Sequence, residues 1–248
     1  MKLYVIENNH YDWKSKNSKE ILKMFSNKYN LEFPSYLNSG KPILIQGYIS
    51  ISHSNEFLLI AYSDNPIGID CSFLLKENLD DISKNINLKI ACALHYAIKI
   101  SYKINTQIKW PNDLILSSRK CAGILIETQI SLNKIQAIIV GFGINIYKQE
   151  FENELKQSAI ALEDFNNQTY DCNLFLSNLF NHLDDFLYTK NTIEYIKKHM
   201  IPIGSYVSIS RNNTKEIVKI IDLNSEGQLI IERNNGEILT LFNEEISV

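Results

Sequence analysis

The chain has 248 residues, of which 45% are hydrophobic and 21% are charged. This composition supports one substantial hydrophobic core with a small appended module. The formal net charge of −3 and the lack of a dense lysine and arginine cluster argue against direct DNA binding. No stretch approaches the roughly 20 apolar residues that span a bilayer, and the N-terminus lacks a signal-peptide pattern. We therefore expect a soluble, cytoplasmic protein with no membrane association.

The first part of the chain is rich in short β-favouring runs. Residues 2–7 alternate weakly and predict a strand, and residues 18–29 carry apolar residues at helical spacing. Three further β-rich runs, at residues 43–52, 57–63 and 67–75, are separated by short polar turns. We expect these three runs to be antiparallel neighbours.

A long helix and several strands are expected in the middle of the chain. Residues 86–102 place apolar side chains at helical intervals, so this helix should cover a sheet and His95 should belong to its packing. Residues 104–127 predict a strand, a polar turn and a second strand. Residues 135–140 form the continuous apolar run of a buried strand. If the strands pair in sequence order, Asn145 leaves the sheet at the end where the preceding lysines lie.

The sequence pattern changes within the C-terminal part of the chain. Residues 172–187 and 192–200 show the apolar spacing of helices that pack as an outer layer. From residue 203 onward, short strands alternate with Asn-Asn, Glu-Gly and Asn-Gly turns. This pattern predicts a small β-barrel of about fifty residues. We expect two domains, residues 1–200 and residues 201–248.

The four cysteines are far apart in the sequence and lie in apolar surroundings. They are Cys71, Cys92, Cys121 and Cys172. None of them has the Cys-x-x-Cys or cysteine–histidine spacing of a metal site. We therefore expect buried, reduced thiols.

Chemistry-bearing residues concentrate in residues 109–113, Lys-Trp-Pro-Asn-Asp, and in residues 120–125, Lys-Cys-Ala-Gly-Ile-Leu. Both segments lie at the ends of neighbouring predicted strands, so Lys109, Asp113 and Lys120 should converge on one site. Taken singly, the lysines are equally compatible with solvated strand ends, and Pro-Asn-Asp with an ordinary turn. Their combination in this order favours a binding site.

Two ammonium groups and a carboxylate between apolar strands suit an anionic, partly apolar ligand. Each charge-assisted hydrogen bond contributes about 1.5–3 kcal/mol. Lys109 and Lys120 are placed to hold a carboxylate against a nucleotide α-phosphate and to neutralise the charge that develops, as acyl adenylation requires. Asp113 either binds a divalent cation, orients an incoming amine or caps its own turn. Gly123 would let a ligand approach the backbone closely.

Three motifs in this order resemble those of the bacterial biotin protein ligases, in the short form without an N-terminal helix-turn-helix. They are residues 109–113, residues 120–125 and residues 141–145, Gly-Phe-Gly-Ile-Asn, followed by the small β-barrel. The resemblance covers residues 87–248. It implies an α/β (α+β) fold with a mixed central sheet flanked by helices, similar to the class II synthetases, and an SH3-like C-terminal barrel.

The resemblance also implies an activity. Such enzymes join biotin to ATP to form biotinyl-5′-AMP, and then transfer biotin to a lysine of the biotin carboxyl carrier protein of a carboxylase. By the same resemblance, Lys120 contacts the biotin carboxylate or the adenylate linkage, and Lys109 the phosphates. The implied ligands are biotin, ATP and Mg²⁺, with Asp113 as the metal ligand. The implied binding residues besides Lys120 are Trp110, Asn112, Gly123, Gly143 and Asn145, with the two asparagines on the adenine side.

The family's Gly/Arg-rich loop, which closes over the adenylate, has no counterpart in the first part of the chain. By position it falls on residues 50–61, which contain neither glycine nor arginine. The arginines of the chain are Arg119, Arg211 and Arg233. Because a planar guanidinium is well suited to phosphate, its loss predicts weak retention of the adenylate. A protein that binds biotin or adenylate with impaired catalysis is therefore an alternative.

Residues 40–72 carry a second resemblance, to the first half of the Sfp-type phosphopantetheinyl transferases. It rests on Gly-Lys-Pro at 40–42, Ile-Ser-Ile-Ser-His-Ser at 49–54 and Pro-Ile-Gly-Ile-Asp at 66–70. In that family the histidine meets the coenzyme A phosphates, and the aspartate binds magnesium together with a glutamate two residues on. Here Ser72 takes the place of that glutamate, so His53 and Asp70 are expected to be structural. A transferase-like protein is the remaining alternative.

Overall fold

The computed structural model describes the backbone of most of the chain. The described residues are 2–7, 35–36, 42–43, 48–53, 57–63, 69–75, 78–148, 151, 155–189, 191–211, 214–242 and 244–247. Side chains are described from residue 71 onward within these ranges, except at positions 72, 74 and 189. The helix expected at residues 18–29, and the side chains of His53 and Asp70, lie outside the described parts.

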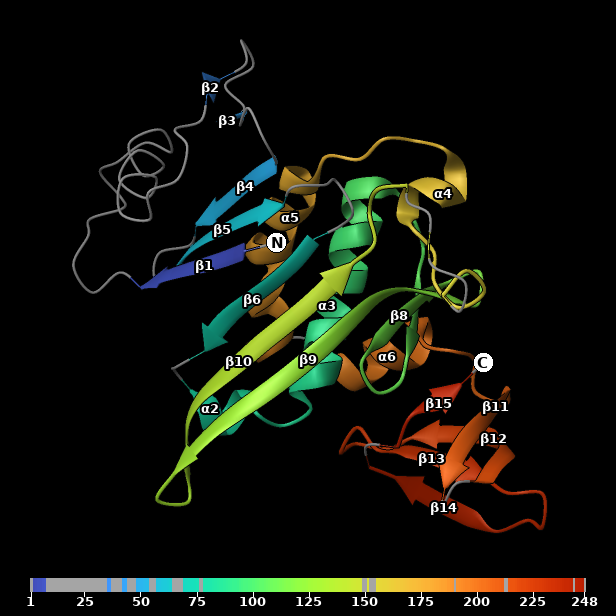
Figure 1. The fold of residues 1–248 in the computed structure, drawn as a ribbon. Helices are drawn as coiled ribbons and strands as arrows, with labels where there is room; N and C mark the ends of the chain where they lie inside the picture. The colour runs from blue at the N-terminus through green and yellow to red at the C-terminus, as the bar shows by residue number, and fades with distance from the viewer. Residues whose placement is uncertain are drawn as a thin grey trace.

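A five-stranded sheet with strand order β6-β10-β9-β8-β7 forms the centre of the fold (Figure 1). Its strands are β6 (Ile69–Leu75), β7 (Gln107–Lys109), β8 (Asp113–Leu116), β9 (Arg119–Ser131) and β10 (Lys134–Ile144). Every pairing in this sheet is antiparallel, so the expectation of a mixed sheet is wrong for the described strands. The reason is local, because β7 to β10 are joined by short turns that only antiparallel neighbours can use.

Helices cover one face of this sheet, as expected. Helix α3 (Ile86–Tyr102) packs against the sheet, and α5 (Cys172–Asp184) packs on α3 (Figure 1). A π-helical turn, η2 (Asp185–Thr189), and helix α6 (Thr192–His199) follow, while α2 (Leu79–Ile82) and α4 (Leu162–Asn166) are short. His95 is 1% exposed and belongs to the packing of α3, which confirms its expected structural role.

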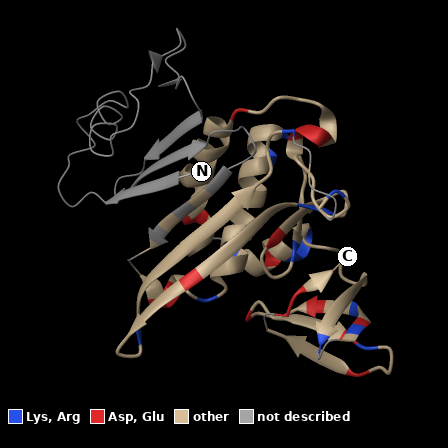
Figure 2. Cartoon of the chain, viewed as in Figure 1, with Lys and Arg blue, Asp and Glu red and all other residues tan. Residues whose placement is uncertain are grey.

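The long strands β9 and β10 present different faces to the helices and to solvent. Ile124, Val140 and Phe142 are buried on the helix-covered face. On the other face Leu125 is 65% exposed. Figure 2 shows β10 almost without charge along its length. The uncovered face is therefore largely apolar along β10.

The N-terminal strands form a separate three-stranded antiparallel sheet with the order β1-β5-β4. Its strands are β1 (Lys2–Glu7), β4 (Tyr48–His53) and β5 (Phe57–Ser63), and two-residue strands β2 (Ser35–Tyr36) and β3 (Pro42–Ile43) pair with each other. The predicted pairing of β4 with β5 is confirmed. The prediction that β6 continues this sheet is wrong, because β6 pairs with β10 instead.

Five strands follow α6 and form a second antiparallel sheet with the order β14-β13-β12-β11-β15. They are β11 (Tyr206–Arg211), β12 (Thr214–Leu223), β13 (Leu229–Glu232), β14 (Ile238–Leu241) and β15 (Ile246–Ser247). Within the described residues no pairing closes β14 onto β15. The predicted strands are confirmed, whereas a closed barrel is not.

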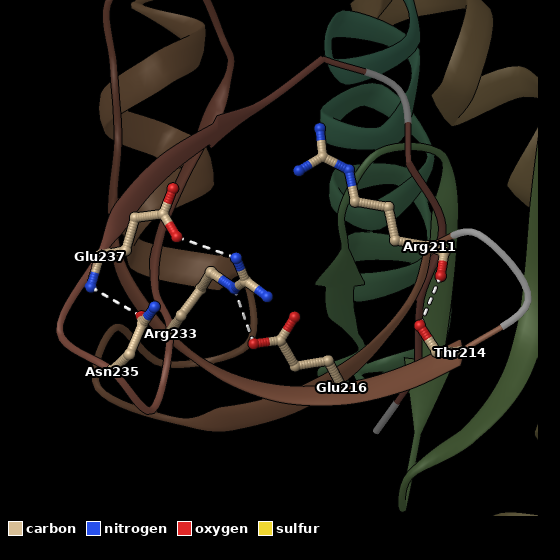
Figure 3. Close-up of polar contacts among 6 residues, drawn as sticks. All are labelled: Arg211, Thr214, Glu216, Arg233, Asn235 and Glu237. Atoms are coloured by element: carbon tan, nitrogen blue, oxygen red, sulfur yellow. Dashed lines mark hydrogen bonds and ion pairs between the residues drawn. The ribbon is translucent and has the colours of Figure 1, made fainter.

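Arg233 ties the strands of this C-terminal sheet together (Figure 3). Its Nε lies 2.8 Å from Glu216 Oε1 on β12, and its Nη1 lies 2.8 Å from Glu237 Oε2 just before β14. These carboxylates raise the pKa of the Arg233 guanidinium above its usual range. Both carboxylates lie in the C-terminal sheet or next to it. Arg233 therefore stabilises this sheet and does not serve the segments at residues 109–113 and 120–125.

The helices offer no membrane span. Among the residues that the structure describes, no helix is both long enough and apolar enough to cross a bilayer.

Candidate active site

Lys109, Asp113 and Lys120 meet on the uncovered face of the central sheet. Lys109 Nζ lies 2.9 Å from Asp113 Oδ2, and Lys120 Nζ lies 2.7 Å from Asp113 Oδ1. Lys109 and Asp113 are also direct cross-strand partners at the β7–β8 turn, which places their side chains on the same face. The predicted convergence of the three residues is confirmed.

A β-bulge brings Lys120 to this face. Asp113 pairs with Gly123 and Ile115 pairs with Lys120, so Cys121 is one extra residue in β9. In a regular strand, residues 120 and 123 would point to opposite faces because side chains alternate. The extra residue restores Lys120 to the side of Asp113. Cys121 itself is fully buried, and its thiol donates to the Leu114 carbonyl at 3.4 Å.

The three charged side chains of this cluster differ in their exposure to solvent. The Asp113 side chain is 3% exposed, that of Lys109 is 13% exposed and that of Lys120 is 49% exposed. Although Lys120 Nζ is within ion-pair distance, Asp113 Oδ1 accepts no hydrogen bond from the described residues, so the approach is poorly aligned. Two ammonium groups face one carboxylate, and the cluster therefore carries a net positive charge that suits an anion.

Glycines leave the face beside this cluster without side chains. Gly123 on β9 pairs with Gly143 on β10, and Gly141 pairs with Leu125. A Cβ on Gly123 would lie 2.8 Å from Lys120 Cε and 2.9 Å from Lys120 Nζ. Gly123 is thus needed for the approach of Lys120 to Asp113. The bare backbone beside the exposed Leu125 gives a flat apolar floor next to the cations.

Asn112 and Asn145 flank the same region. The Asn112 side-chain amide donates to the Ile124 carbonyl at 3.0 Å, and the Ile124 amide donates to the Asn112 carbonyl at 2.9 Å. The Asn145 amide donates to the Cys121 carbonyl at 2.9 Å, beside Lys120. The expectation that Asn145 leaves the sheet at the lysine end is confirmed. Both asparagine residues are partly exposed.

A segment that the sequence analysis missed supports the backbone of Lys120. The Lys120 amide donates to the Ser158 carbonyl at 2.7 Å, and the Ile160 amide donates to the Lys120 carbonyl at 3.0 Å. Glu163 then accepts from the amides of Lys148 at 3.0 Å and Tyr170 at 3.2 Å, which fixes the chain that follows Asn145. The available signal was the isolated apolar run at residues 159–162, Ala-Ile-Ala-Leu.

Trp110, which the family resemblance placed among the binding residues, lies in the interior. Its side chain is 1% exposed, and its indole N–H donates to the Gly227 carbonyl at 3.0 Å. The tryptophan therefore joins the β7–β8 turn to the C-terminal sheet.

The donor set does not fit a protein-held Mg²⁺. Both oxygens of Asp113 face lysine ammonium groups, and the described residues contain no cluster of three or more potential metal ligands. A hard divalent cation requires several oxygen ligands, and two adjacent ammonium groups repel it. The assignment of Asp113 as a metal ligand therefore disagrees with the geometry, and no step of the proposed reaction below passes through a metal.

Comparison with known proteins shows which proteins the segment around this site resembles. Residues 71–145 match the family described as Biotin/lipoate A/B protein ligase family. This segment contains both lysine cassettes and extends to Asn145, so it holds every candidate site residue. The segment that carries the candidate site is therefore similar to the biotin and lipoate ligases.

Two individual proteins show this similarity in more detail. The bifunctional ligase/repressor BirA of Bacillus subtilis is 26% identical over 184 residues, covering 71% of this chain and 57% of that protein. The apo biotin protein ligase of Aquifex aeolicus is 26% identical with a TM-score of 0.61, covering 73% of this chain and 81% of that chain. The same enzyme solved with biotin and ATP is 25% identical with a TM-score of 0.60, covering 74% of this chain and 79% of that chain.

The sequence comparison and the structure comparison point to the same group of proteins. The chain is similar to these biotin protein ligases in sequence, and its α/β fold resembles that of the Aquifex aeolicus enzyme. It spans little more than half of the length of the curated relative, 57%.

Proposed function

We propose that the protein activates biotin with ATP to biotinyl-5′-AMP and transfers biotin to a lysine of a carboxylase carrier protein. The observation that carries this proposal is the pair of lysines that converge on the buried Asp113 beside a glycine floor. The Aquifex aeolicus relative, which was solved with biotin and ATP, supports the choice of ligands.

In the first step, a biotin carboxylate oxygen attacks the α-phosphorus of ATP. The bond to the bridging oxygen of the β-phosphate breaks, and pyrophosphate leaves. Both reactants are anions, so their approach requires positive charge at the point of contact. We assign Lys120 to the biotin carboxylate and the new mixed anhydride, and Lys109 to the phosphates. Neither ammonium needs to give up its proton in this step.

In the second step, the amine of the carrier lysine attacks the biotinyl carbonyl carbon, and the bond from that carbon to the AMP oxygen breaks. The amine loses a proton to solvent, and AMP leaves as an anion beside the same cations. Asp113 Oδ1 accepts no hydrogen bond from the described residues, so we assign it the orientation of the incoming amine. Its other function is to hold both ammonium groups in place.

Other residues shape the binding surface in this proposal. Gly123 and Gly143 give the ligand close access to the backbone of β9 and β10, and Asn112 and Asn145 lie on the adenine side. We further propose that β11–β15 form an SH3-like module, with the domain boundary between residues 200 and 201. A cytoplasmic location and the absence of direct DNA binding belong to the same proposal.

Biotin-dependent exchange of labelled pyrophosphate into ATP tests the first step. Lys120→Ala should abolish exchange while changing the midpoint of thermal unfolding little, because Lys120 is half-exposed. Lys134→Ala is the matched control, since Lys134 is an exposed lysine at the start of β10. Absence of exchange by the folded wild-type chain at high biotin would exclude the proposed catalysis.

Binding without efficient turnover is a second candidate. The arginine-free residues expected to hold the phosphate loop, 50–61, fall largely on β4 and β5, which pair as antiparallel strands. A strand pair without guanidinium groups gives poor retention of an adenylate. Calorimetry distinguishes the two candidates, because a binder gives heat with biotin but forms no AMP from ATP and biotin.

A further inference from the structure

We infer that the C-terminal sheet positions Lys109 through Trp110, so that Trp110 and Gly227 are positioning residues for the nucleotide half of the site. This inference rests on the proposed function for its kinetic readout. Its structural basis is the hydrogen bond of 3.0 Å from the Trp110 indole N–H to the Gly227 carbonyl, between residues 117 positions apart in the chain.

The acceptor belongs to a well-ordered turn between β12 and β13. The Gly227 amide donates to the Asn224 carbonyl at 3.0 Å. The Asn224 side-chain oxygen accepts from the amides of Glu226 at 3.0 Å and Gln228 at 2.9 Å. Gly227 has a φ of +73°, a conformation that favours glycine. The Gly227 carbonyl is thus held in a fixed direction by its own turn.

This turn is wedged against the start of α3. A Cβ on Gly227 would lie 2.5 Å from Asn85 Oδ1 and 2.8 Å from Leu88 Cδ1. Any side chain at this position would therefore clash with Asn85 and Leu88 and displace the turn that holds the carbonyl. The close fit makes Gly227 sensitive to substitution for a reason that is independent of ligand binding.

The donor belongs to the segment that carries the phosphate and adenine residues. Trp110 directly follows Lys109 and is separated from Asn112 only by Pro111. A second tie holds the same edge of the sheet, because the Ile201 amide donates to the Ile108 carbonyl at 3.1 Å. The chain leading into the C-terminal sheet and the β12–β13 turn therefore hold Ile108 and Trp110, the two residues on either side of Lys109.

Lys120 is supported differently. It lies on β9, and its backbone forms hydrogen bonds with Ser158 and Ile160. Within the described residues, it forms no hydrogen bond with the β12–β13 turn. Loosening Trp110 should therefore disturb Lys109 and Asn112 more than Lys120. The expected kinetic signature is a weaker interaction with ATP and a nearly unchanged interaction with biotin.

We call the hydrogen bond from Trp110 to Gly227, with its effect on Lys109, the clamp. Trp110→Phe tests it, because this substitution removes the N–H donor and keeps an aromatic ring in the core. In pyrophosphate exchange by the full chain, the KM for ATP should rise about fivefold, the equivalent of one hydrogen bond. The KM for biotin should stay within about twofold. Gly227→Ala, which displaces the acceptor, should give the same split. Equal changes in both KM values would show a general structural effect and overturn the inference.

Lys197→Met is the matched control at the same contact region. Lys197 Nζ lies 2.7 Å from Asp222 Oδ1, which links α6 to β12 without involving Trp110. If the C-terminal sheet acts only by general stabilisation, Lys197→Met should raise the KM for ATP as Trp110→Phe does. The clamp predicts that it leaves both KM values unchanged.

A measurement that does not depend on catalysis, the chemical labelling of Lys109, tests this inference separately from the proposed function. Lys109 is 13% exposed, and its acetylation by an N-hydroxysuccinimide ester can be followed by peptide mass spectrometry. Trp110→Phe and Gly227→Ala should accelerate the labelling of Lys109, and Lys197→Met should not. Faster labelling in a chain that shows no exchange would support the clamp while rejecting the ligase activity. Unchanged Lys109 labelling in both variants would overturn the clamp.

Discussion

Gly123 and the ammonium end of Lys120 compete for one volume, since a Cβ on Gly123 would lie 2.9 Å from Lys120 Nζ. Gly123 is half-buried and has no positive φ, so its backbone does not itself require glycine. The glycine is instead needed because the ion pair of Lys120 with Asp113 occupies the space above it.

Gly123→Ala should therefore reduce activity without unfolding the chain. The added methyl group displaces the flexible end of Lys120, which costs little stability but removes a cation from the site. We expect at least a tenfold loss of pyrophosphate exchange, about the effect of one misplaced charged donor, and a stability change under about 1 kcal/mol. Gly141→Ala is the stability control, because its Cβ would meet Leu125 only at 3.6 Å or more. Full activity of Gly123→Ala would contradict this reading of the site.

Asp113→Asn should both destabilise the protein and inactivate it. Lys109 and Lys120 would then repel each other without the carboxylate that holds them. We expect a loss of about 1–3 kcal/mol, below the cost of breaking a fully buried pair because Lys120 is 49% exposed. Urea denaturation of Asp113→Asn, Lys109→Met and the double variant measures the coupling. Additive losses in the double variant would show that the pair contributes no coupling energy.

Stability should fall as pH drops from about 6.5 to about 4. Burial, together with the positive charges of His199 and Lys99, lowers the pKa of His95 to about 4. His95 Nδ1 lies 2.8 Å from the Tyr195 hydroxyl on α6. The unfolded chain binds a proton near pH 6.5 whereas the folded chain does not, so stability is full above pH 6.5 and declines below it. The maximum loss is about 3 kcal/mol.

Urea unfolding at several pH values in this window measures the effect. His95→Asn removes the titrating group, so its free energy of unfolding should depend less steeply on pH than that of the wild type. The slope is the diagnostic quantity, because the substitution also changes packing. Identical slopes for the two proteins would show that His95 does not remain neutral when the chain is folded.

Thiol reagents should discriminate between the native and unfolded chain. Burial, together with the charge of Asp113, raises the pKa of the Cys121 thiol to about 12. Burial likewise raises the pKa of Cys92. Only the thiolate reacts, so iodoacetamide at pH 8 should leave both residues unmodified in the folded protein and modify them in denaturant. Rapid native labelling of Cys121, followed by mass spectrometry, would show that the bulge opens.

Patterns with a strong local cause were predictable from the sequence. The helix at residues 86–102 matched its structure at both ends because its apolar periodicity is long and uninterrupted. The convergence of Lys109, Asp113 and Lys120 followed from two strands joined by a polar turn. Both depend on residues close together in the chain, where spacing alone limits the geometry.

Long-range partners were not predictable from the sequence. The pairing of β6 with β10 joins segments about seventy residues apart, and no turn signal specifies it. Trp110 was expected at the ligand because its neighbours are there, but its indole is used by Gly227, 117 residues away. The support of Lys120 by residues 158–160 is equally remote. Each of these contacts is decided by tertiary packing, which a local motif does not encode.

The extra residue in β9 has a consequence for engineering this chain. Residues 119 and 120 lie between the β8–β9 turn and the bulge at Cys121. The face to which their side chains point depends on that one added residue. Removing one residue between Lys120 and Gly123 would straighten the strand and rotate the lysine to the helix-covered side. The hairpin could still pair, and the hydrophobic core would receive a charge in exchange for the cation lost from the site. Strand length, and not only residue identity, therefore encodes the polarity of the two faces at this point.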